Sequence, residues 1–387
     1  MKKPTPYKII IVGGGPSGLA TALYLARLSP ALAAELLILE AAEHPRPKLC
    51  GGGVTFHGEE QLRNLGLQIN VTSFAVHRLD FRLERLGFTV AIPNAMCVIE
   101  RSEFDAALAQ AVADRGLQLQ SNEKLIDLRP TAGGVELTTS RAQYYAKIVI
   151  GADGANSTVR RKLHLPEQTN IARLLRVLTP VDPTCDPDWQ RHTAVFDFSC
   201  VLQGIQGYVW DFPCYIAGQP YMNRGIFDSR IERRTAAKQR RGNLKQTFLT
   251  GLNARHINLD RIPLEGHPVR WFNPKAEFSR PHVLLAGDAA GVDPLFAEGI
   301  SYGMEYGQVI AETVRDAFAR NDFSFRHYRT RLLDHRLGRL LVRRAMVARH
   351  LFLPRWPGLW SLLWQLAAIA PLKMQRGIGS FLGVLPP

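Results

Sequence analysis

The feature that most constrains this chain lies within its first thirty residues. A short β-branched run, residues 7–12, leads directly into Gly13-Gly14-Gly15-Pro16-Ser17-Gly18, and an apolar, Ala-rich stretch follows over residues 19–28. The run predicts a strand and the stretch predicts a helix, so the order is strand, glycine turn, helix. The N-terminus of such a helix offers free N–H groups and a positive dipole end to phosphates. The unit therefore predicts a dinucleotide site in a parallel α/β domain.

The residues of this turn have separate predicted roles. Gly13 permits the tight turn, Gly15 lets the backbone approach a pyrophosphate, and Gly18 lets the helix pack on the strand. We expect Ser17 to contact the same cofactor. Glu40 follows Gly18 by 22 residues and closes a second short strand, where a carboxylate can accept hydrogen bonds from ribose hydroxyls.

Two later turns indicate FAD rather than NAD. Residues 151–154 (GADG) and 287–291 (GDAAG) each end an apolar strand in a small residue plus Asp, and an extended cofactor needs contacts beyond its adenosine half. Asp288 is suited to the ribitol chain, while a helix that begins near residue 298 can direct its N-terminal dipole at the pyrimidine edge of the flavin. The predicted contacts here are Asp153, Gly287, Asp288, Gly299 and Ile300.

These three elements occur in the same order in the FAD-dependent aromatic hydroxylase-like superfamily, which the chain resembles. Two further segments are similar to its geranylgeranyl reductase branch: residues 47–52 (PKLCGG) match PxxCGG, and residues 208–213 (YVWDFP) match YxWxFP. The resemblance covers most of residues 7–320. The chain departs from the family pattern at one point. The family usually has a glycine soon after the FP pair, whereas here residues 214–224, which contain only Gly218, precede Gly225.

The resemblance implies roles for further residues. It places Lys48, Cys50, Gly51 and Gly52 beside the isoalloxazine, and Arg101 near the phosphates or the adenosine. It also implies that an isoprenoid pocket is lined by Tyr208, Trp210, Phe212 and Pro213. The candidate catalytic residues are Cys50, Tyr208 and Trp210, with Cys50 either donating a proton or gating the ring.

The predicted fold class is α/β, with a discontinuous Rossmann-type FAD-binding domain over residues 1–165 and 271–322, including a small strand insertion near 70–100. Residues 166–270 alternate in the manner of an antiparallel sheet and are assigned to a substrate domain. Residues 323–387 form a basic, amphipathic, helical C-terminal region.

The predicted function is an FAD-dependent reductase that saturates carbon–carbon double bonds of an isoprenoid or geranylgeranyl-type lipid chain. Because only one dinucleotide fingerprint is present, the external reductant must dock transiently; NADPH is favoured over NADH or a ferredoxin-like protein. An FAD-dependent monooxygenase of the aromatic hydroxylase type is the first alternative. A flavin-dependent halogenase is a weaker alternative. Those enzymes need a Lys in the first third of the chain, and this chain has none between Lys48 and Lys124. A basic binding protein with a vestigial cofactor site is the third.

The C-terminal region predicts a peripheral membrane protein. The formal charge of the chain is +14, and residues 323–387 hold eleven Lys or Arg against one acid, Asp334, which leaves +10 there. Over residues 326–350 the leucines, among them Leu337 and Leu341, share a helix side into which Arg344 intrudes. Tryptophans repeat at 356, 360 and 364, as rings at a headgroup boundary do. We expect docking on an anionic lipid surface, against the alternative of a helical cap on the catalytic domain.

Composition limits the remaining partners. The five cysteines lack CxxC spacing, and no His/Cys pattern has the spacing of a zinc site, so we expect no metal. The N-terminus lacks a signal-peptide pattern, which predicts the cytoplasmic side of a membrane. No nucleic acid partner is expected.

Overall fold

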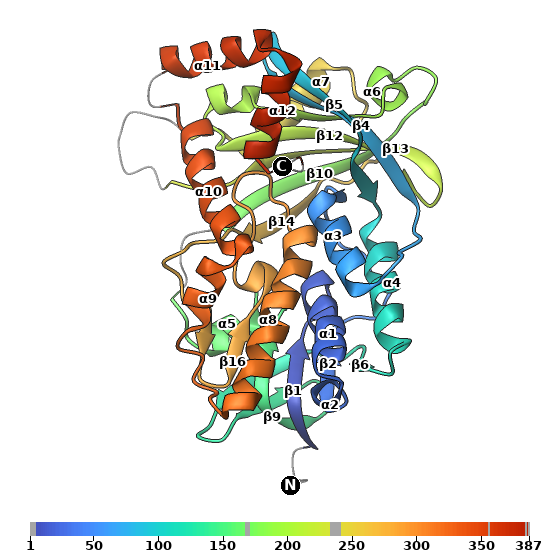
Figure 1. The fold of residues 1–387 in the computed structure, drawn as a ribbon. Helices are drawn as coiled ribbons and strands as arrows, with labels where there is room; N and C mark the ends of the chain where they lie inside the picture. Colours follow the sequence, from blue (N-terminus) through green and yellow to red (C-terminus); the bar gives the residue numbers. More distant parts are fainter. Residues whose placement is uncertain (1–4, 167–170, 233–240, 355–356, 384, 386–387) are drawn as a thin grey trace.

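The computed structural model describes residues 5–166, 171–232, 241–354, 357–383 and 385. Two large sheets, one in the lower and one in the upper half of the view, are flanked by helices (Figure 1). The predicted α/β class with a Rossmann-type FAD-binding domain and a helical C-terminal region is confirmed.

The first sheet is built around five parallel strands. Its order is β15-β16-β9-β1-β2-β6, with β15 antiparallel to β16 and with β7 and β8 forming an antiparallel extension from β9. The strands are β1 (Thr5–Val12), β2 (Leu36–Leu39), β6 (Gln118–Gln120), β7 (Leu125–Pro130), β8 (Val135–Thr139), β9 (Gln143–Gly151), β15 (Ser279–Arg280) and β16 (Val283–Leu285).

Helices flank this sheet. The helices α1 and α8 pack against each other, although they are distant in sequence. Their close approach requires a glycine at residue 307 of α8, because a Cβ there would lie 2.7 Å from the Thr21 nitrogen of α1. The helices are α1 (Pro16–Leu28), α2 (Pro30–Ala33), α3 (Phe56–Leu65), α4 (Arg101–Ala113), α5 (Thr158–Lys162) and α8 (Ile300–Arg320).

The second sheet has the order β14-β10-β13-β12-β11-β4-β5-β3. Its pairs are antiparallel except β11 with β4, which is parallel. The strands are β3 (Gly53–Thr55), β4 (Ser73–Leu83), β5 (Leu86–Ile99), β10 (Ile171–Pro180), β11 (Thr193–Asp197), β12 (Gly207–Ile216), β13 (Gln219–Asp228) and β14 (Glu265–Arg270). The strands near residues 70–100 thus pair with the sheet that we assign to substrate, and the domain limits drawn from the sequence stay a prediction.

Short helices flank the second sheet, and four helices follow α8. The former are α6 (Pro187–Gln190), α7 (Leu244–Ala254) and the 3-10 turn η1 (Ser199–Gln203), whereas the 3-10 turn η2 (Gly287–Ala289) follows β16 of the first sheet. The latter are α9 (Tyr328–Asp334), α10 (Arg336–Leu351), α11 (Pro357–Ile369) and α12 (Leu372–Phe381). The helices α9 and α10 run along one edge of the molecule, and α11 and α12 lie at the end of the second sheet (Figure 1).

Candidate active site

The site lies where the carboxyl ends of three parallel strands meet. The register pairs Val12 of β1 and Leu285 of β16 with the same residue of β9, Gly151. The three turns that follow these strands therefore lie side by side, as ligand-binding loops do at the edge of a parallel sheet. This pairing brings the predicted motifs at residues 13–18, 151–154 and 287–291 to one place.

The glycines of the first turn face different surroundings. A Cβ on Gly13, whose φ is +112°, would lie 2.3 Å from the Ala152 oxygen, and a Cβ on Gly18 would lie 2.0 Å from the Gly13 oxygen. A Cβ on Gly15 would meet only the Arg46 Nη2, at 3.8 Å. Gly13 and Gly18 are thus required by the fold itself, whereas Gly15 leaves an open cradle where a pyrophosphate fits.

Buried polar atoms around this cradle also fit a cofactor. Within the described residues, the Ser17 Oγ and the Asp153 Oδ1 are buried and have no hydrogen-bond partner. The other oxygen of Asp153 accepts hydrogen bonds from the backbone of Thr158 and Val159, at 2.6 and 3.0 Å. Because a buried polar atom without a partner is costly, these two atoms suit the hydroxyl and phosphate groups of FAD.

Glu40 holds the turn as well as facing the cavity. Its carboxylate accepts hydrogen bonds from the Gly14 nitrogen at 2.7 Å and from the Ala42 nitrogen at 3.0 Å, and it pairs with Arg46 at 3.4 Å. The predicted contact with ribose hydroxyls stays a prediction, since part of the carboxylate is already used by the backbone.

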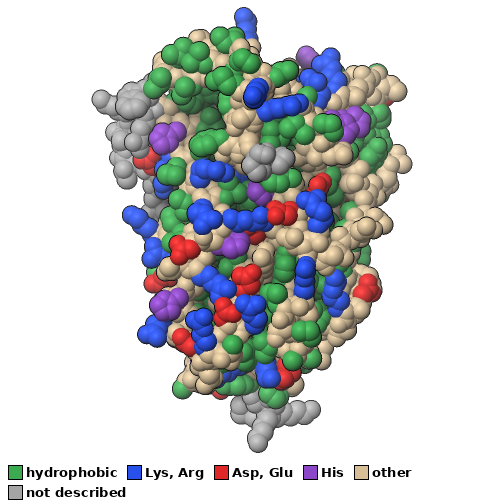
Figure 2. All heavy atoms as spheres, in the orientation of Figure 1, with side chains coloured by type: hydrophobic (Ala, Val, Ile, Leu, Met, Phe, Trp, Pro, Cys, Tyr) green, Lys and Arg blue, Asp and Glu red, His purple; other side chains and the backbone are tan. Residues whose placement is uncertain are grey.

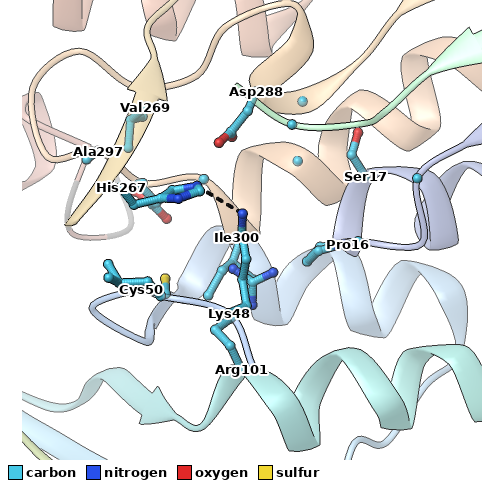
Figure 3. A pocket seen from close by; sticks show the side chains of 18 of the residues that line it. Pro16, Ser17, Lys48, Cys50, Arg101, His267, Val269, Asp288, Ala297 and Ile300 are labelled. Carbon is cyan, nitrogen blue, oxygen red and sulfur yellow. Dashed lines mark hydrogen bonds between the residues drawn. The ribbon is translucent and has the colours of Figure 1, made fainter. Parts of the chain in front are cut away.

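A cluster of cations lines the middle of the cavity (Figure 3). The Lys48 Nζ lies 2.9 Å from the His267 Nε2, and Arg101 makes a two-pronged pair with Asp105 at 3.0 and 2.8 Å. Burial lowers the pKa of Lys48, and burial together with Lys48 and Arg101 lowers the pKa of His267 to about 4. A neutral His267 can therefore accept a hydrogen bond from the Lys48 Nζ.

The PxxCGG loop is tied to the second sheet. The Cys50 carbonyl accepts hydrogen bonds from Arg176 at 3.2 Å and from the Asn223 amide at 2.9 Å. A Cβ on Gly51 would lie 3.5 Å from the Phe212 ring. Gly52 has a φ of +79°, and a Cβ there would lie only 2.4 Å from the Ile99 oxygen. The glycines thus let the loop run between β5 and the aromatic strand β12.

The aromatic motif forms one face of β12. Alternate residues of a strand share a face, so Tyr208, Trp210 and Phe212 line the cavity together, and each is buried. The Tyr208 hydroxyl donates to the Phe296 oxygen at 2.6 Å, and the Trp210 indole donates to Asn223 at 3.1 Å. The wall therefore presents ring faces rather than free polar groups. Pro213 does not line the cavity, because it lies on the opposite face of the strand.

The cavity has a volume of about 630 Å³ and joins all these groups. Of the residues predicted from sequence, Gly18 and Pro213 lie outside its wall. The wall contains Gly13, Gly15, Ser17, Glu40, Lys48, Cys50, Gly51, Gly52, Arg101, Asp153, Tyr208, Trp210, Phe212, Gly287, Asp288, Gly299 and Ile300. Their roles toward cofactor and substrate stay predictions.

Sequence reasoning missed several residues of the wall. Arg46 and Thr55 lie just outside the PxxCGG motif, Phe196 lies on the neighbouring strand β11, and His267 comes from β14. For His267 the local sequence held no signal, since its place depends on the pairing of β14 with β10.

Fold and cavity together define an FAD-dependent oxidoreductase. The FAD binding domain family matches residues 6–307, and the chain belongs to that family.

Two relatives share about a quarter of their residues with this chain. The menaquinone reductase of Mycolicibacterium smegmatis is 27% identical over 320 residues, covering 79% of this chain and 75% of its own length. Digeranylgeranylglycerophospholipid reductase 2 of Methanosphaera stadtmanae is 27% identical over 348 residues, covering 86% of this chain and 84% of its own. The resemblance to geranylgeranyl-type reductases is thereby confirmed.

A solved structure shares the fold. The geranylgeranyl bacteriochlorophyll reductase-like protein of Thermoplasma acidophilum superposes with a TM-score of 0.74 at 23% identity, covering 91% of this chain and 89% of its own.

Proposed function

We propose that this protein is an FAD-dependent reductase that saturates carbon–carbon double bonds in the isoprenoid chain of a membrane lipid. The observation that carries the proposal is the aromatic face of β12 lying against the PxxCGG loop in the same cavity as the dinucleotide turns. The names of the two relatives support a substrate of this class, a lipid or a quinone with an isoprenoid chain.

FAD, when bound, supplies the two electrons that such a reduction consumes. The residues of the dinucleotide turns and the ribitol-facing Asp288 would hold it, and burial raises the pKa of Asp288 although Lys48 and Arg101 oppose this. The chain's remaining tasks are to exclude water and to deliver a proton, because an isolated alkene accepts a hydride poorly unless it is protonated with it.

The aromatic residues suit the first task better than the second. Burial raises the pKa of Tyr208 well above its usual range, and its hydroxyl proton is already donated to the Phe296 oxygen. We therefore assign Tyr208 and Trp210 to shaping an apolar pocket, and we keep Cys50 as the predicted proton donor or gate.

We further propose that the protein docks on a membrane surface, through a different face than the sequence suggested. Leu337 and Leu341 are fully buried, so α10 is a cap on the catalytic body. Trp360 and Trp364 are 7% exposed and pack inward, Trp364 against Phe198, rather than standing at a headgroup boundary; position 356 lies outside the described residues.

The exposed apolar surface instead covers the outer side of α11 and α12. Figure 2 shows hydrophobic side chains gathered over α11 at the top of the view, with Lys and Arg side chains nearby. We define this outer apolar face by its residues, which are between 47% and 80% exposed: Leu359, Leu362, Leu363, Leu366, Ile369, Leu372, Met374 and Phe381. A contiguous apolar patch of this kind marks an interaction site.

The arginines contribute less free charge to this surface than their number suggests. Arg331 pairs with Asp316 at 2.7 Å and Arg336 pairs with Glu60 at 2.8 Å, so acids elsewhere in the chain neutralise part of the basic region. Among the described residues, no helix combines the length and apolar character that crossing a bilayer requires. We therefore expect apolar insertion at the outer apolar face, assisted by Lys373 and Arg376, to dominate peripheral binding at the cytoplasmic side.

Anaerobic incubation of the reduced protein with a panel of substrates tests this function. Geranylgeranyl lipids, isoprenoid quinones and polyprenyl diphosphates would each be analysed by mass for added hydrogen. Gain of hydrogen by one chain type identifies the substrate, and no gain by any of them would refute the proposal.

The rate of flavin reduction by NADPH, NADH and a reduced ferredoxin compares the proposed reductants, of which we expect NADPH to be fastest.

A further inference from the structure

A single buried arginine joins the C-terminal helices to the loop that precedes α8. Arg344 of α10 is 0% exposed, and its Nη1 pairs with Asp293 and, at 3.1 Å, with Glu298. Its Nε and Nη2 donate to the carbonyls of Leu382 at 3.0 Å and Gly383 at 2.8 Å, at the end of α12. One guanidinium thus uses all three of its nitrogens to connect two segments far apart in sequence.

The loop over residues 293–299 is part of the cavity wall. Asp293 accepts hydrogen bonds from the backbone of Leu295 at 2.8 Å and Phe296 at 3.0 Å, while Glu298 accepts one from Thr55. Phe296 in turn accepts the Tyr208 hydroxyl bond. The wall includes residues 296–300, so the loop touches both the aromatic face and the first turn of α8.

The charges of this cluster lie next to the end of α8 predicted to face the flavin. Burial acts to raise the pKa of Glu298, but Arg344, His57 and the hydrogen bonds to this carboxylate together outweigh burial and lower the pKa. Burial raises the pKa of Asp293 despite Arg344. Without Arg344, a negative charge on either carboxylate would have no screening cation beside the positive end of the helix dipole.

The Arg344 guanidinium also lies over two rings of the same region. Its centre is 5.3 Å from the Phe296 ring and 5.0 Å from the Tyr302 ring. A buried ion pair that served stability alone could be replaced by apolar side chains at little cost. Here the cation instead fixes the position of a cavity loop through pairing, hydrogen bonding and ring contacts together.

We propose that Arg344 is a positioning residue for the flavin: it fixes the loop over residues 293–299, screens Asp293 and Glu298, and thereby raises the reduction potential of the bound FAD. The proposal needs the flavin but not the isoprenoid substrate. It also makes the flavin site depend on the end of α12, because the same guanidinium binds the carbonyls there.

The midpoint potential of the bound flavin, measured over a range of pH, tests the proposal. Arg344→Met should disfavour the reduced flavin about tenfold, which is about 30 mV toward more negative potential for a two-electron couple. Adding Glu298→Gln to this variant removes one negative charge and should move the potential back. Arg339→Gln, an exposed arginine on the same helix, should leave the potential unchanged.

Three results would overturn the proposal. An Arg344→Met protein that keeps its flavin with the wild-type potential excludes the charge effect. An equal shift in Arg339→Gln would make the effect one of general surface charge. If Arg344→Met does not fold, Glu298→Gln alone decides: the proposal expects a more positive potential, and an unchanged potential contradicts it.

Discussion

The Lys48 Nζ lies 2.9 Å from the His267 Nε2, which joins the PxxCGG loop of the flavin domain to a strand that follows it by more than two hundred residues. The pair stands between Asp288 and Cys50 in the cavity (Figure 3). Both groups are bases, so one nitrogen must donate a hydrogen to this bond and the other must accept it. Since burial together with Lys48 and Arg101 lowers the pKa of His267 to about 4, His267 is neutral at physiological pH and can accept a hydrogen bond from Lys48.

This pair predicts a pH dependence of stability. In the unfolded chain His267 takes up a proton near its ordinary pKa of about 6.5, whereas the folded flavin-free protein binds it only near pH 4. The unfolded state therefore binds more protons between these values, and stability is lost as pH falls through that window. His267→Gln should flatten this loss without abolishing it, because the pKa values of His57 and His335 are also lowered.

Thermal melting of flavin-free protein across this pH range is the measurement. Equal slopes in wild-type and His267→Gln protein would show that His267 titrates normally.

The contrast between Gly15 and Gly18 tests the cofactor cradle. Gly15→Val should keep the fold, since its Cβ meets only the Arg46 Nη2 at 3.8 Å, but should abolish flavin retention by filling the cradle. Gly18→Val should instead lower stability by about 1 to 3 kcal/mol, because its Cβ meets the Gly13 oxygen at 2.0 Å. Flavin absorbance and melting temperature of both purified variants separate the two effects. A fully yellow Gly15→Val protein contradicts the account.

Cys50 should matter for turnover and not for folding. Its carbonyl, rather than its side chain, makes the hydrogen bonds that anchor the loop to Arg176 and Asn223. Cys50→Ser should therefore retain flavin and melting temperature while slowing reduction of the substrate or stopping it early. The measurement is the rate of product formation and the number of bonds saturated. A variant with unchanged rate and product pattern removes Cys50 from the mechanism.

The outer apolar face of α11 and α12 should carry membrane binding. Leu363→Asp combined with Leu366→Asp should weaken flotation with anionic liposomes about tenfold or more, because two exposed leucines no longer insert. Ile126→Asp on β7, where the side chain is 53% exposed, is the matched control and should float normally. High salt should weaken binding only in part. Point variants are preferable to deleting the chain after Leu353, since that deletion also removes the Arg344 partners.

If liposomes bind the double variant and the wild type equally, the membrane contact lies outside the outer apolar face. A wild type that stays in solution at low salt would refute membrane docking itself.

The sequence predicted the site best where short motifs carry their own geometry. The glycine turn, the strand ends at Asp153 and Asp288, and the alternation of residues 208–212 each depend on local spacing, and the fold brings them to one cavity. Pairing between distant strands carries no such signal. For that reason His267 was missed, and so was the joining of β3, β4 and β5 to the second sheet.

The C-terminal region shows the limit most clearly. Helical periodicity placed Arg344 among leucines. Only the tertiary structure shows that Arg344 can be buried there because it pairs with Asp293 and Glu298. Periodicity likewise could not distinguish tryptophans that pack inward from leucines that face outward on the same helix. The sequence identified the apolar side of α10 at Leu337 and Leu341, but not that this side packs against the protein, and membrane docking stays a prediction.

We propose that electrons pass from flavin to an isoprenoid double bond without oxygen. The most direct measurement follows the absorbance of the reduced, bound flavin under nitrogen after a geranylgeranyl lipid is added, with product mass determined at the end. We expect oxidised flavin to return, one flavin per double bond saturated, and the fully saturated lipid to have no effect. Flavin that is reoxidised only when oxygen is admitted, with a product that gains an oxygen atom, would contradict it and indicate a monooxygenase.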